Sequence, residues 1–336
     1  MDTSTVPEVP LQAKLTALCS PGFYQEGGTS VEVIETHCAW IFLTKTHAYK
    51  LKKPMLLDRM DNRRLSARQH NCAEELRLNR RLAPDVYLDV VALHSDAAGR
   101  LSLGGPGTVV EWLVKMRRLP RALLLDQALA AGTATPRLVE PVCRLLANFY
   151  CREPSVSMPG EAYCRRLEQE IEVNGQALAQ TDLGFPNGLI DAAITAQRKL
   201  LKDQWQMLAS RADAGRIIEA HGDLKPEHIY LGEPPCVIDC LEFDRDLRLL
   251  DPLEELAFFT LECEKLGASW IGRQALAAYL DASADEASES LFGFYLSRRA
   301  ARRALTAAWH LRDPSVRERR DWRAVADDYL CRALAA

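Results

Sequence analysis

Two segments carry the strongest functional signal in this chain: HGDLKPEHI at residues 221–229 and VID at residues 237–239. They place Asp223 on a tight loop, a basic residue, Lys225, two positions later, and Asp239 at the end of a short apolar run. The two aspartates are 16 residues apart, enough for a loop, a strand, a turn and a returning strand. We therefore expect both carboxylates in one cleft, the first accepting a proton from a hydroxyl and the second holding Mg²⁺, an arrangement suited to phosphoryl transfer from a nucleotide.

The first third of the chain predicts an antiparallel sheet. Short runs rich in β-branched and aromatic residues alternate with polar connections. They are VEVIE (31–35), AWIFLT (39–44), HAYKLKK (47–53), VYLDVVAL (86–93) and TVVEWLVKM (108–116). The pattern predicts a five-stranded sheet that is complete by about residue 116.

Two lysines lie inside the third of these strands. Alternation places Lys50 and Lys52 on the same face, where a charged side chain needs a partner or an anionic ligand. Residues 62–82, which follow, have helical spacing and carry Glu74 and Glu75. Glu74 and Glu75 are therefore candidate partners for these two lysines.

The remainder of the chain predicts helices. Apolar residues recur at three- and four-residue spacing in segments 138–153, 162–180 and 187–213. The expected fold class is α+β and bilobal. A small β-rich lobe with one key helix (residues 1–115) would bind the nucleotide, and a larger, mainly helical lobe (residues 116–336) would carry the catalytic loop and the substrate pocket.

Composition narrows the function classes. The chain has 336 residues, a net charge of −4 and a pI near 6, which argues against nucleic acid as a partner. It contains no apolar stretch of about 18 residues, and its start, MDTSTVPEVP, lacks the basic end and apolar run of a leader. Ten cysteines without a C-x-x-C pair indicate reduced thiols. We expect a cytoplasmic protein that does not bind membranes, and no partner protein is identified.

The loop at 221–229 resembles the catalytic loop of the protein-kinase-like phosphotransferases. H-G-D is the form of the aminoglycoside phosphotransferase and choline-kinase relatives, and D-L-K-P-E is closer to Ser/Thr protein kinases. The resemblance implies a protein-kinase-like fold and ATP-dependent transfer of the γ-phosphoryl group to a hydroxyl of a small molecule. Asp223 would orient and deprotonate that hydroxyl, and Lys225 would neutralise charge on the moving group. The implied cofactors are ATP and Mg²⁺.

The resemblance also implies roles for the β-rich lobe. Lys50 would contact the α- and β-phosphates while paired with Glu75, with Lys52 and Glu74 as the alternatives. Asp239 would bind Mg²⁺. The chain contains neither G-x-G-x-x-G before these strands nor a P-loop motif, which disfavours Rossmann and P-loop nucleotide sites.

Two further segments are expected to meet the nucleotide. Glu111, Trp112 and Leu113 would form the hinge whose backbone bonds the adenine edge, although Trp112 fits a core position equally well. Thr36, in ETHCAW at residues 35–40, stands where a glycine-rich hairpin would cover the phosphates. Thr36 either contacts phosphate or belongs to an ordinary hairpin turn.

His228 departs from the family pattern, which has an asparagine metal ligand five residues after the catalytic aspartate. An imidazole can bind a divalent ion, but Mg²⁺ prefers oxygen ligands. His228 is therefore either a metal ligand or a hydrogen-bonded structural residue. Asp251-Pro-x-x-Glu255 resembles the family segment that supports the catalytic loop.

Four arginines near the C-terminus allow two interpretations. They could bind an anionic substrate or form a solvated or ion-paired helix face, which is the commoner outcome. The four are Arg298, Arg299, Arg302 and Arg303.

Segments ETHCAW, AYKLKKP, EELRLNRRLAP and EWLVKMRRLP resemble a bacterial branch of the family in which the domain is sometimes fused to a P-loop ATPase domain. Two other functions stay open. Lys225-Pro226-Glu227 is compatible with a Ser/Thr kinase acting on a protein substrate. His228 and the missing glycine loop are compatible with a non-catalytic nucleotide-binding protein.

Overall fold

A computed structural model describes residues 9–24, 26–57, 59–180, 187–312, 318 and 320–336. The chain forms two units. One comprises Met1–Leu123 together with Val237–Asp244, and the other comprises Leu124–Cys236 together with Arg245–Ala336. The first crossing lies at 123/124 rather than at the expected 115/116. The chain also returns to the first unit for eight residues, and this returning segment carries Asp239.

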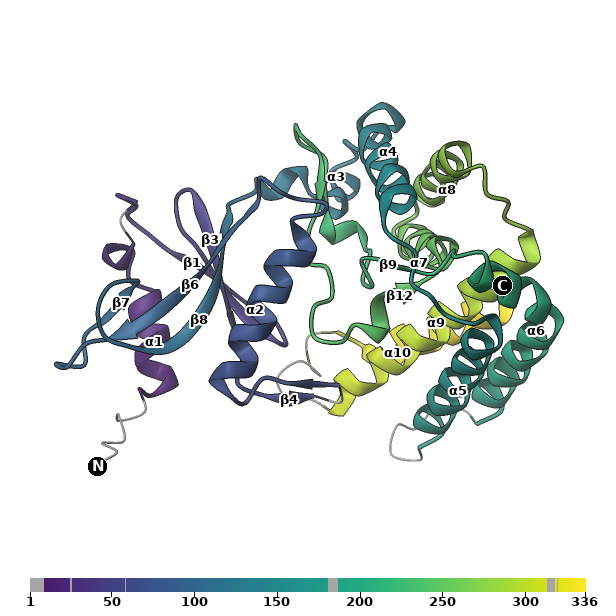
Figure 1. Cartoon of the computed structure of the whole chain (residues 1–336), viewed down its shortest axis with the longest axis horizontal. Helices are drawn as coiled ribbons and strands as arrows, with labels where there is room; N and C mark the ends of the chain where they lie inside the picture. The colour runs from purple at the N-terminus through teal and green to yellow at the C-terminus, as the bar shows by residue number, and fades with distance from the viewer. Residues whose placement is uncertain (1–8, 25, 58, 181–186, 313–317, 319) are drawn as a thin grey trace. The chain divides into compact units, whose positions relative to one another are not determined.

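The first unit is built on a six-stranded antiparallel sheet (Figure 1). Its strands are, in spatial order, β1 (Glu32–Glu35), β2 (Ala39–Leu43), β3 (His47–Lys52), β8 (Thr108–Arg117), β6 (Tyr87–Ser95) and β7 (Leu101–Leu103). A separate ribbon pairs β4 (Leu56–Leu57) with β5 (Met60–Asp61). The sheet has one strand more than predicted, because the three residues of β7 are too few for a periodic pattern to show.

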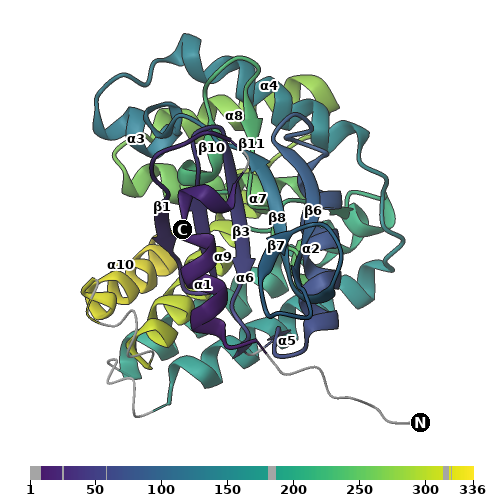
Figure 2. The same ribbon diagram turned by 90° about the vertical axis from the view of Figure 1, so that its left-hand side faces the viewer.

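Helices cover both faces of this sheet (Figure 2). On one face, Leu18 of α1 (Leu11–Leu18) packs in a core cluster with Tyr49 and Leu51 of β3. On the other, α2 (Leu65–Asn79) packs against β6 and β8. The period-two alternation of β3 turns its intervening lysines toward α2.

The second unit is mainly helical. Its helices are α3 (Leu125–Ala130), α4 (Pro136–Arg152), α5 (Gly160–Leu178), α6 (Asn187–Asp213), α7 (Pro252–Lys265), α8 (Ser269–Ser283), α9 (Glu289–Arg312) and α10 (Trp322–Ala335). The antiparallel pair β9 (Ile218–Glu219) and β12 (Leu249–Leu250) flanks the loop at residues 221–229 in the sequence, and β10 (Ile229–Tyr230) ends that loop. The strand β11 (Cys236–Val237) lies where the chain crosses to the first unit. These two units confirm the predicted α+β class.

The start of α7 is set by its own sequence. Asp251 caps the helix by accepting a hydrogen bond from the backbone N–H of Leu253 at 2.9 Å, and Pro252 occupies the first helical position, where no N–H is needed. The helix is buried on nearly every side, including Glu254 and Glu255. Buried carboxylates at a helix start require specific partners, and α7 thereby delivers two of them to the interior of the unit.

No helix in the described part of the chain combines the length and hydrophobicity needed to span a bilayer.

Candidate active site

The first unit gathers charged side chains from three separate segments. Lys50 Nζ on β3 lies 2.9 Å from Glu75 Oε1 on α2. Lys52 Nζ lies 2.5 Å from the other oxygen of the same carboxylate. The structure therefore brings together both lysines with Glu75. Glu74 instead pairs with Arg77 on the exposed side of α2.

Asp239 joins this cluster from the returning segment. Its Oδ1 lies 2.6 Å from Lys50 Nζ, and its side chain is 44% exposed. Its backbone has φ of +63°, a left-handed conformation that aspartate tolerates better than most residues. The backbone N–H of Asp239 donates to the Tyr87 hydroxyl at 3.0 Å, and that of Cys240 donates to Asn79 Oδ1 at 2.9 Å. These bonds hold the strained turn in place.

A second ion pair ties the returning segment to the sheet. Lys52 Nζ also donates to Glu242 Oε1. Burial acts to lower the pKa of Lys50, but Asp239, Glu75 and Glu242 outweigh it and hold that pKa well above its usual value. Burial likewise acts to raise the pKa of Glu75, and the two ammonium groups lower it instead. Lys50 and Glu75 are therefore both charged at neutral pH.

In the second unit, the loop at residues 221–229 forms a smaller ionic group. Lys225 Nζ lies 2.9 Å from Asp223 Oδ2 and 3.1 Å from Glu227 Oε1. Burial acts to raise the pKa of Asp223, but Lys225, followed by His228 and Arg303, holds it well below its usual value. Asp223 is therefore ionised and ready to accept a hydrogen bond.

The backbone of this loop is fixed by Glu255. Its Oε1 accepts from the N–H of Gly222 at 2.5 Å, and its Oε2 accepts from the N–H of His221 at 3.1 Å and from the Tyr150 hydroxyl at 3.0 Å. Burial raises the pKa of Glu255, against the opposing effect of these hydrogen bonds. Glu255 thus occupies the supporting position that its sequence motif indicated.

His221 and His228 both bond within the loop. The backbone N–H of Asp223 donates to His221 Nδ1 at 3.3 Å, and His221 is fully buried. His228 Nδ1 lies 2.8 Å from the Asp223 carbonyl oxygen. Since a carbonyl only accepts, Nδ1 carries the proton. This contact is the hydrogen-bonded structural role that was one of the two expectations, and the metal-ligand role of His228 stays a prediction.

The expected hinge is wrong. Glu111, Trp112 and Leu113 lie inside β8, paired with Leu93, Ala92 and Val91 of β6. The Glu111 side chain is buried in ion pairs with Lys14 and Arg68, and Leu113 is fully buried. The sequence could not show where this long strand ends. The segment that leaves the sheet for the second unit is residues 118–123.

Thr36 closes the hairpin between β1 and β2. Its hydroxyl donates to the Ala39 carbonyl at 3.0 Å and accepts from the Ala39 N–H at 3.0 Å. Of the two expectations for this residue, the structure favours the ordinary hairpin turn.

The sequence analysis did not predict several residues that hold the Asp239 turn and the loop at residues 221–229. Tyr87 and Asn79 were read only as strand and helix positions, and Glu242 as part of the chain after Asp239. Arg299, whose guanidinium donates to the Gly222 carbonyl at 3.2 Å, was grouped with its neighbours on α9. One signal was available: a second lysine two positions after Lys50 calls for a second carboxylate.

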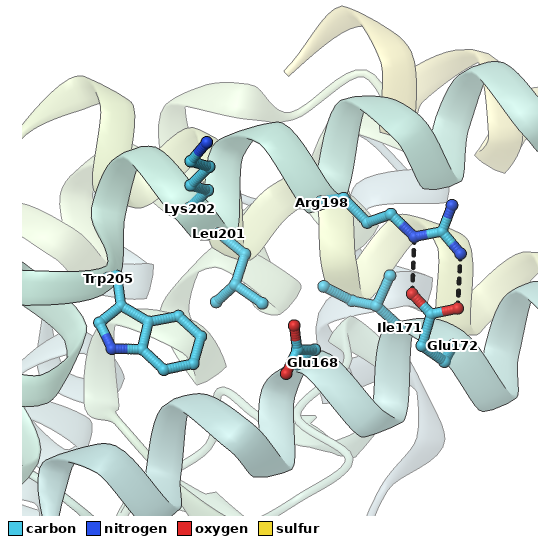
Figure 3. Close-up of a pocket in the computed structure, with 7 residues that line it drawn as sticks. All are labelled: Glu168, Ile171, Glu172, Arg198, Leu201, Lys202 and Trp205. Carbon is cyan, nitrogen blue, oxygen red and sulfur yellow. Dashed lines mark hydrogen bonds and ion pairs between the residues drawn. The ribbon is translucent and has the colours of Figure 1, made fainter.

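A pocket of ≈340 Å³ lies elsewhere in the second unit, between α5 and α6 (Figure 3). Arg198 on α6 reaches across to Glu172 on α5, and Leu201 and Trp205 form the apolar part of the lining. Because none of the residues predicted for catalysis lines it, we do not assign the active site there.

Comparison with known proteins identifies the family of this chain. The model of the phosphotransferase enzyme family, APH, matches residues 49–292, and the chain belongs to this family. Uncharacterized proteins of Mycobacterium bovis and Mycobacterium tuberculosis are 30% identical over 290 residues, which cover 82% of this chain and 54% of theirs. The chain therefore spans about half the length of these curated relatives.

Two solved structures share the fold. A choline/ethanolamine kinase family protein from Mesorhizobium loti is 18% identical, with a TM-score of 0.56, over 96% of this chain and 94% of its own. A choline kinase from Cryptosporidium parvum Iowa II is 10% identical, with a TM-score of 0.55, over 96% and 94%. At these identities the likeness establishes the fold.

Proposed function

We propose that the protein is an ATP-dependent phosphotransferase that transfers the γ-phosphoryl group to a hydroxyl of a small molecule. The observation that carries this proposal is the contact of Lys50 with both Glu75 and Asp239, at 2.9 and 2.6 Å, across 189 residues of sequence in the second case. Membership of the phosphotransferase family supports it. The choline and ethanolamine kinases among the similar structures support a small alcohol as acceptor.

Asp239 is the residue we propose for Mg²⁺. In the described residues, no group of three or more His, Cys, Asp or Glu side chains forms a metal cage. Mg²⁺ needs no such cage, because it binds one or two carboxylates together with substrate phosphates and waters. The cluster fits a cation, since its three carboxylates exceed its two lysines and Asp239 is its most exposed carboxylate. When bound, the ion would neutralise charge on the phosphates.

Three residues of the chain would bind the nucleotide phosphates and accept the proton. Lys50 would bind the nucleotide phosphates, and Glu75 would fix the position of its ammonium group. Asp223 would accept a hydrogen bond from the acceptor hydroxyl. As the new bond from the acceptor oxygen to the γ-phosphorus forms and the bond to the leaving ADP oxygen breaks, the hydroxyl proton would pass to Asp223.

The low pKa of Asp223 has a consequence for timing. A carboxylate that is ionised so readily is a weak base toward a neutral alcohol, so the proton would move late, after the acceptor oxygen has become more acidic. Lys225, 2.9 Å away, would balance the negative charge of the transferring group. Because ATP is the donor, the proposal also implies a cytoplasmic location.

The proposal is tested by ADP formation from Mg²⁺ and ATP over a panel of small alcohols. We expect stimulation by at least one alcohol, and its loss in Asp223→Asn. The matched control is Asp203→Asn, which alters an exposed carboxylate paired with Lys199 on α6 and should leave the rate unchanged. Nucleotide binding without turnover, identical in wild type and Asp223→Asn, would instead favour the non-catalytic alternative.

A further inference from the structure

Four arginines lie on one face of α9. Positions 298, 299, 302 and 303 share that face because residues three and four apart are neighbours on a helix. Three of them are engaged. Arg298 pairs with Glu170 and Glu254, Arg299 lies 3.6 Å from Glu254, and Arg303 Nε lies 3.2 Å from Glu262 Oε1. Most of this arginine face is therefore ion-paired, as one of the two sequence interpretations anticipated.

Arg302 differs from the other three. It is half-buried, and among the described residues its guanidinium makes neither a hydrogen bond nor an ion pair, although its backbone carbonyl accepts from the Thr306 hydroxyl at 3.1 Å. Burial, together with the like charges of Arg299 and Arg298, lowers its pKa to about 10, although Glu170 and Glu254 act in the opposite direction. A guanidinium offers five N–H donors, and leaving them unsatisfied in a partly buried place is unfavourable. Arg302 is thus positioned to gain from an oxyanion.

The location of Arg302 connects it to the proposed catalytic loop. Arg299, three residues earlier on α9, donates to the carbonyl of Gly222, next to Asp223. Three residues advance a helix by about 4.5 Å, so Arg302 lies within one turn of this contact. The charge of the adjacent Arg303 acts on both Asp223 and Lys225. A small molecule whose hydroxyl reaches Asp223 would therefore lie near the arginine face.

The charged groups around the arginine face indicate which charge a ligand bound there would carry. The carboxylates that pair with it are Glu170, Glu254 and Glu262, one fewer than the four guanidinium groups. Glu255 accepts hydrogen bonds from the loop backbone, and Asp223 shares Lys225 with Glu227. Among the described residues, Arg302 is the one of these four arginines whose side chain has no carboxylate partner. A cationic alcohol would be repelled here and an anionic one attracted.

We propose that the acceptor is an anionic alcohol, a small hydroxyl compound bearing a phosphate or carboxylate group, and that Arg302 binds its oxyanion. This inference rests on the proposed function for the hydroxyl that is phosphorylated. The binding of the oxyanion itself depends only on α9 and the loop. The chain thereby gains a substrate class, the anionic alcohols, and a specificity-determining residue, Arg302.

The test is a binding measurement on the full chain by isothermal titration calorimetry. Four matched probes differ in charge: glycerol 3-phosphate, glycerate, glycerol and choline. We expect both anions to bind the wild type. Arg302→Gln should weaken their binding by about 10- to 100-fold, because a charge-assisted hydrogen bond is lost. Arg302→Lys, which keeps the charge, should lose less.

Controls separate binding from folding. Arg144→Gln removes an exposed arginine, 65% accessible, that pairs with Glu140 on α4, and it should bind all four probes like the wild type. The thermal unfolding of Arg302→Gln, compared with that of Arg302→Lys, reports whether the fold is intact. Tighter binding of glycerol 3-phosphate than of glycerate would assign a phosphate, and the reverse order would assign a carboxylate.

Two outcomes would overturn the inference: binding of choline without binding of either anion, or equal binding of the anions by wild type and Arg302→Gln. Failure of the proposed function gives a different result. If the anions bind through Arg302 but neither they nor any other alcohol stimulates ADP formation, the Arg302 site stands and phosphotransfer does not.

Discussion

The two ionic clusters of this protein are built in different ways. In the first unit, Lys50 and Lys52 on a sheet strand pair with three carboxylates, at 2.5 to 2.9 Å from Glu75 and Asp239. In the second, Asp223 and Lys225 lie on a loop whose backbone is fixed by Glu255. The first cluster is a network of ion pairs with little exposure, whereas the second combines an ion pair with a backbone held by a buried carboxylate. We therefore expect the stability of the first cluster to depend on its charges and that of the second on Glu255.

The largest expected effect concerns the first cluster. Lys52 is 2% exposed, and Lys52→Met would leave Glu75 and Glu242 facing each other without their shared cation. We expect the free energy of unfolding to fall by about 3–5 kcal/mol. Urea unfolding measures it.

The control for that variant is Lys199→Met, which removes a lysine that is 76% exposed and paired with Asp203. An exposed pair of this kind should contribute about 0.5 kcal/mol or less. Equal losses in the two variants would show that the first cluster is not held together by its charges.

The second prediction concerns Lys225. Lys225→Met should lower kcat by about 10²–10³-fold, because it removes a cation beside the transferring group, with nucleotide affinity unchanged. It should also shift the acid limb of the pH–rate profile to higher pH, since burial then raises the pKa of Asp223 without opposition from Lys225. Initial rates across pH measure both effects. A lower nucleotide affinity with unchanged kcat would place Lys225 in nucleotide binding instead.

The third prediction concerns Glu170, a carboxylate that pairs with the arginine face. Burial acts to raise the pKa of Glu170, but Arg298 and Arg166 lower it from 4.5 to about 2. A carboxyl with a depressed folded-state pKa stabilises the protein above its unfolded pKa, and this contribution disappears as the pH falls through the folded value. Glu170→Gln should therefore cost about 2–3 kcal/mol near neutral pH. The difference from wild type should vanish between about pH 4.5 and pH 2. A difference independent of pH would contradict the ion-pair assignment.

The smallest effect is expected at the support of the loop. Tyr150→Phe removes the hydroxyl that donates to Glu255 at 3.0 Å but keeps the ring, which packs edge-on against Tyr279. We expect a loss of about 1 kcal/mol in unfolding free energy. Glu255→Gln, which removes an acceptor from the loop backbone, should cost more. If Tyr150→Phe were the more damaging of the two, the loop would depend on the tyrosine rather than on the carboxylate.

The sequence predicted the elements whose patterns are local. The alternation of β3 placed Lys50 and Lys52 on one face, and the spacing of α2 made Glu75 available to them. Both follow from the backbone geometry of a single strand or helix. The role of Glu255 could be anticipated because Asp251-Pro-x-x-Glu255 resembles the family segment that supports the catalytic loop.

Features that depend on distant segments were missed. The end of β8 could not be read from its sequence, because an apolar run gives no signal where pairing stops, and the hinge was therefore placed at 111–113. Tyr87 and Asn79 support Asp239 across about 150 residues, and no periodicity records such a contact. The return of Val237–Asp244 to the first unit is likewise a tertiary event.

The two clusters have different proposed roles: Lys50 and its partners bind the nucleotide, and Asp223 accepts the proton during phosphoryl transfer. Titrating ATP with Mg²⁺ into Lys50→Met and Asp223→Asn, side by side with wild type, tests this claim most directly. We predict that Lys50→Met loses about tenfold or more in nucleotide affinity, because a charge-assisted contact with phosphate is removed, whereas Asp223→Asn binds ATP like the wild type. Loss of ATP binding in Asp223→Asn together with normal binding in Lys50→Met would contradict the claim.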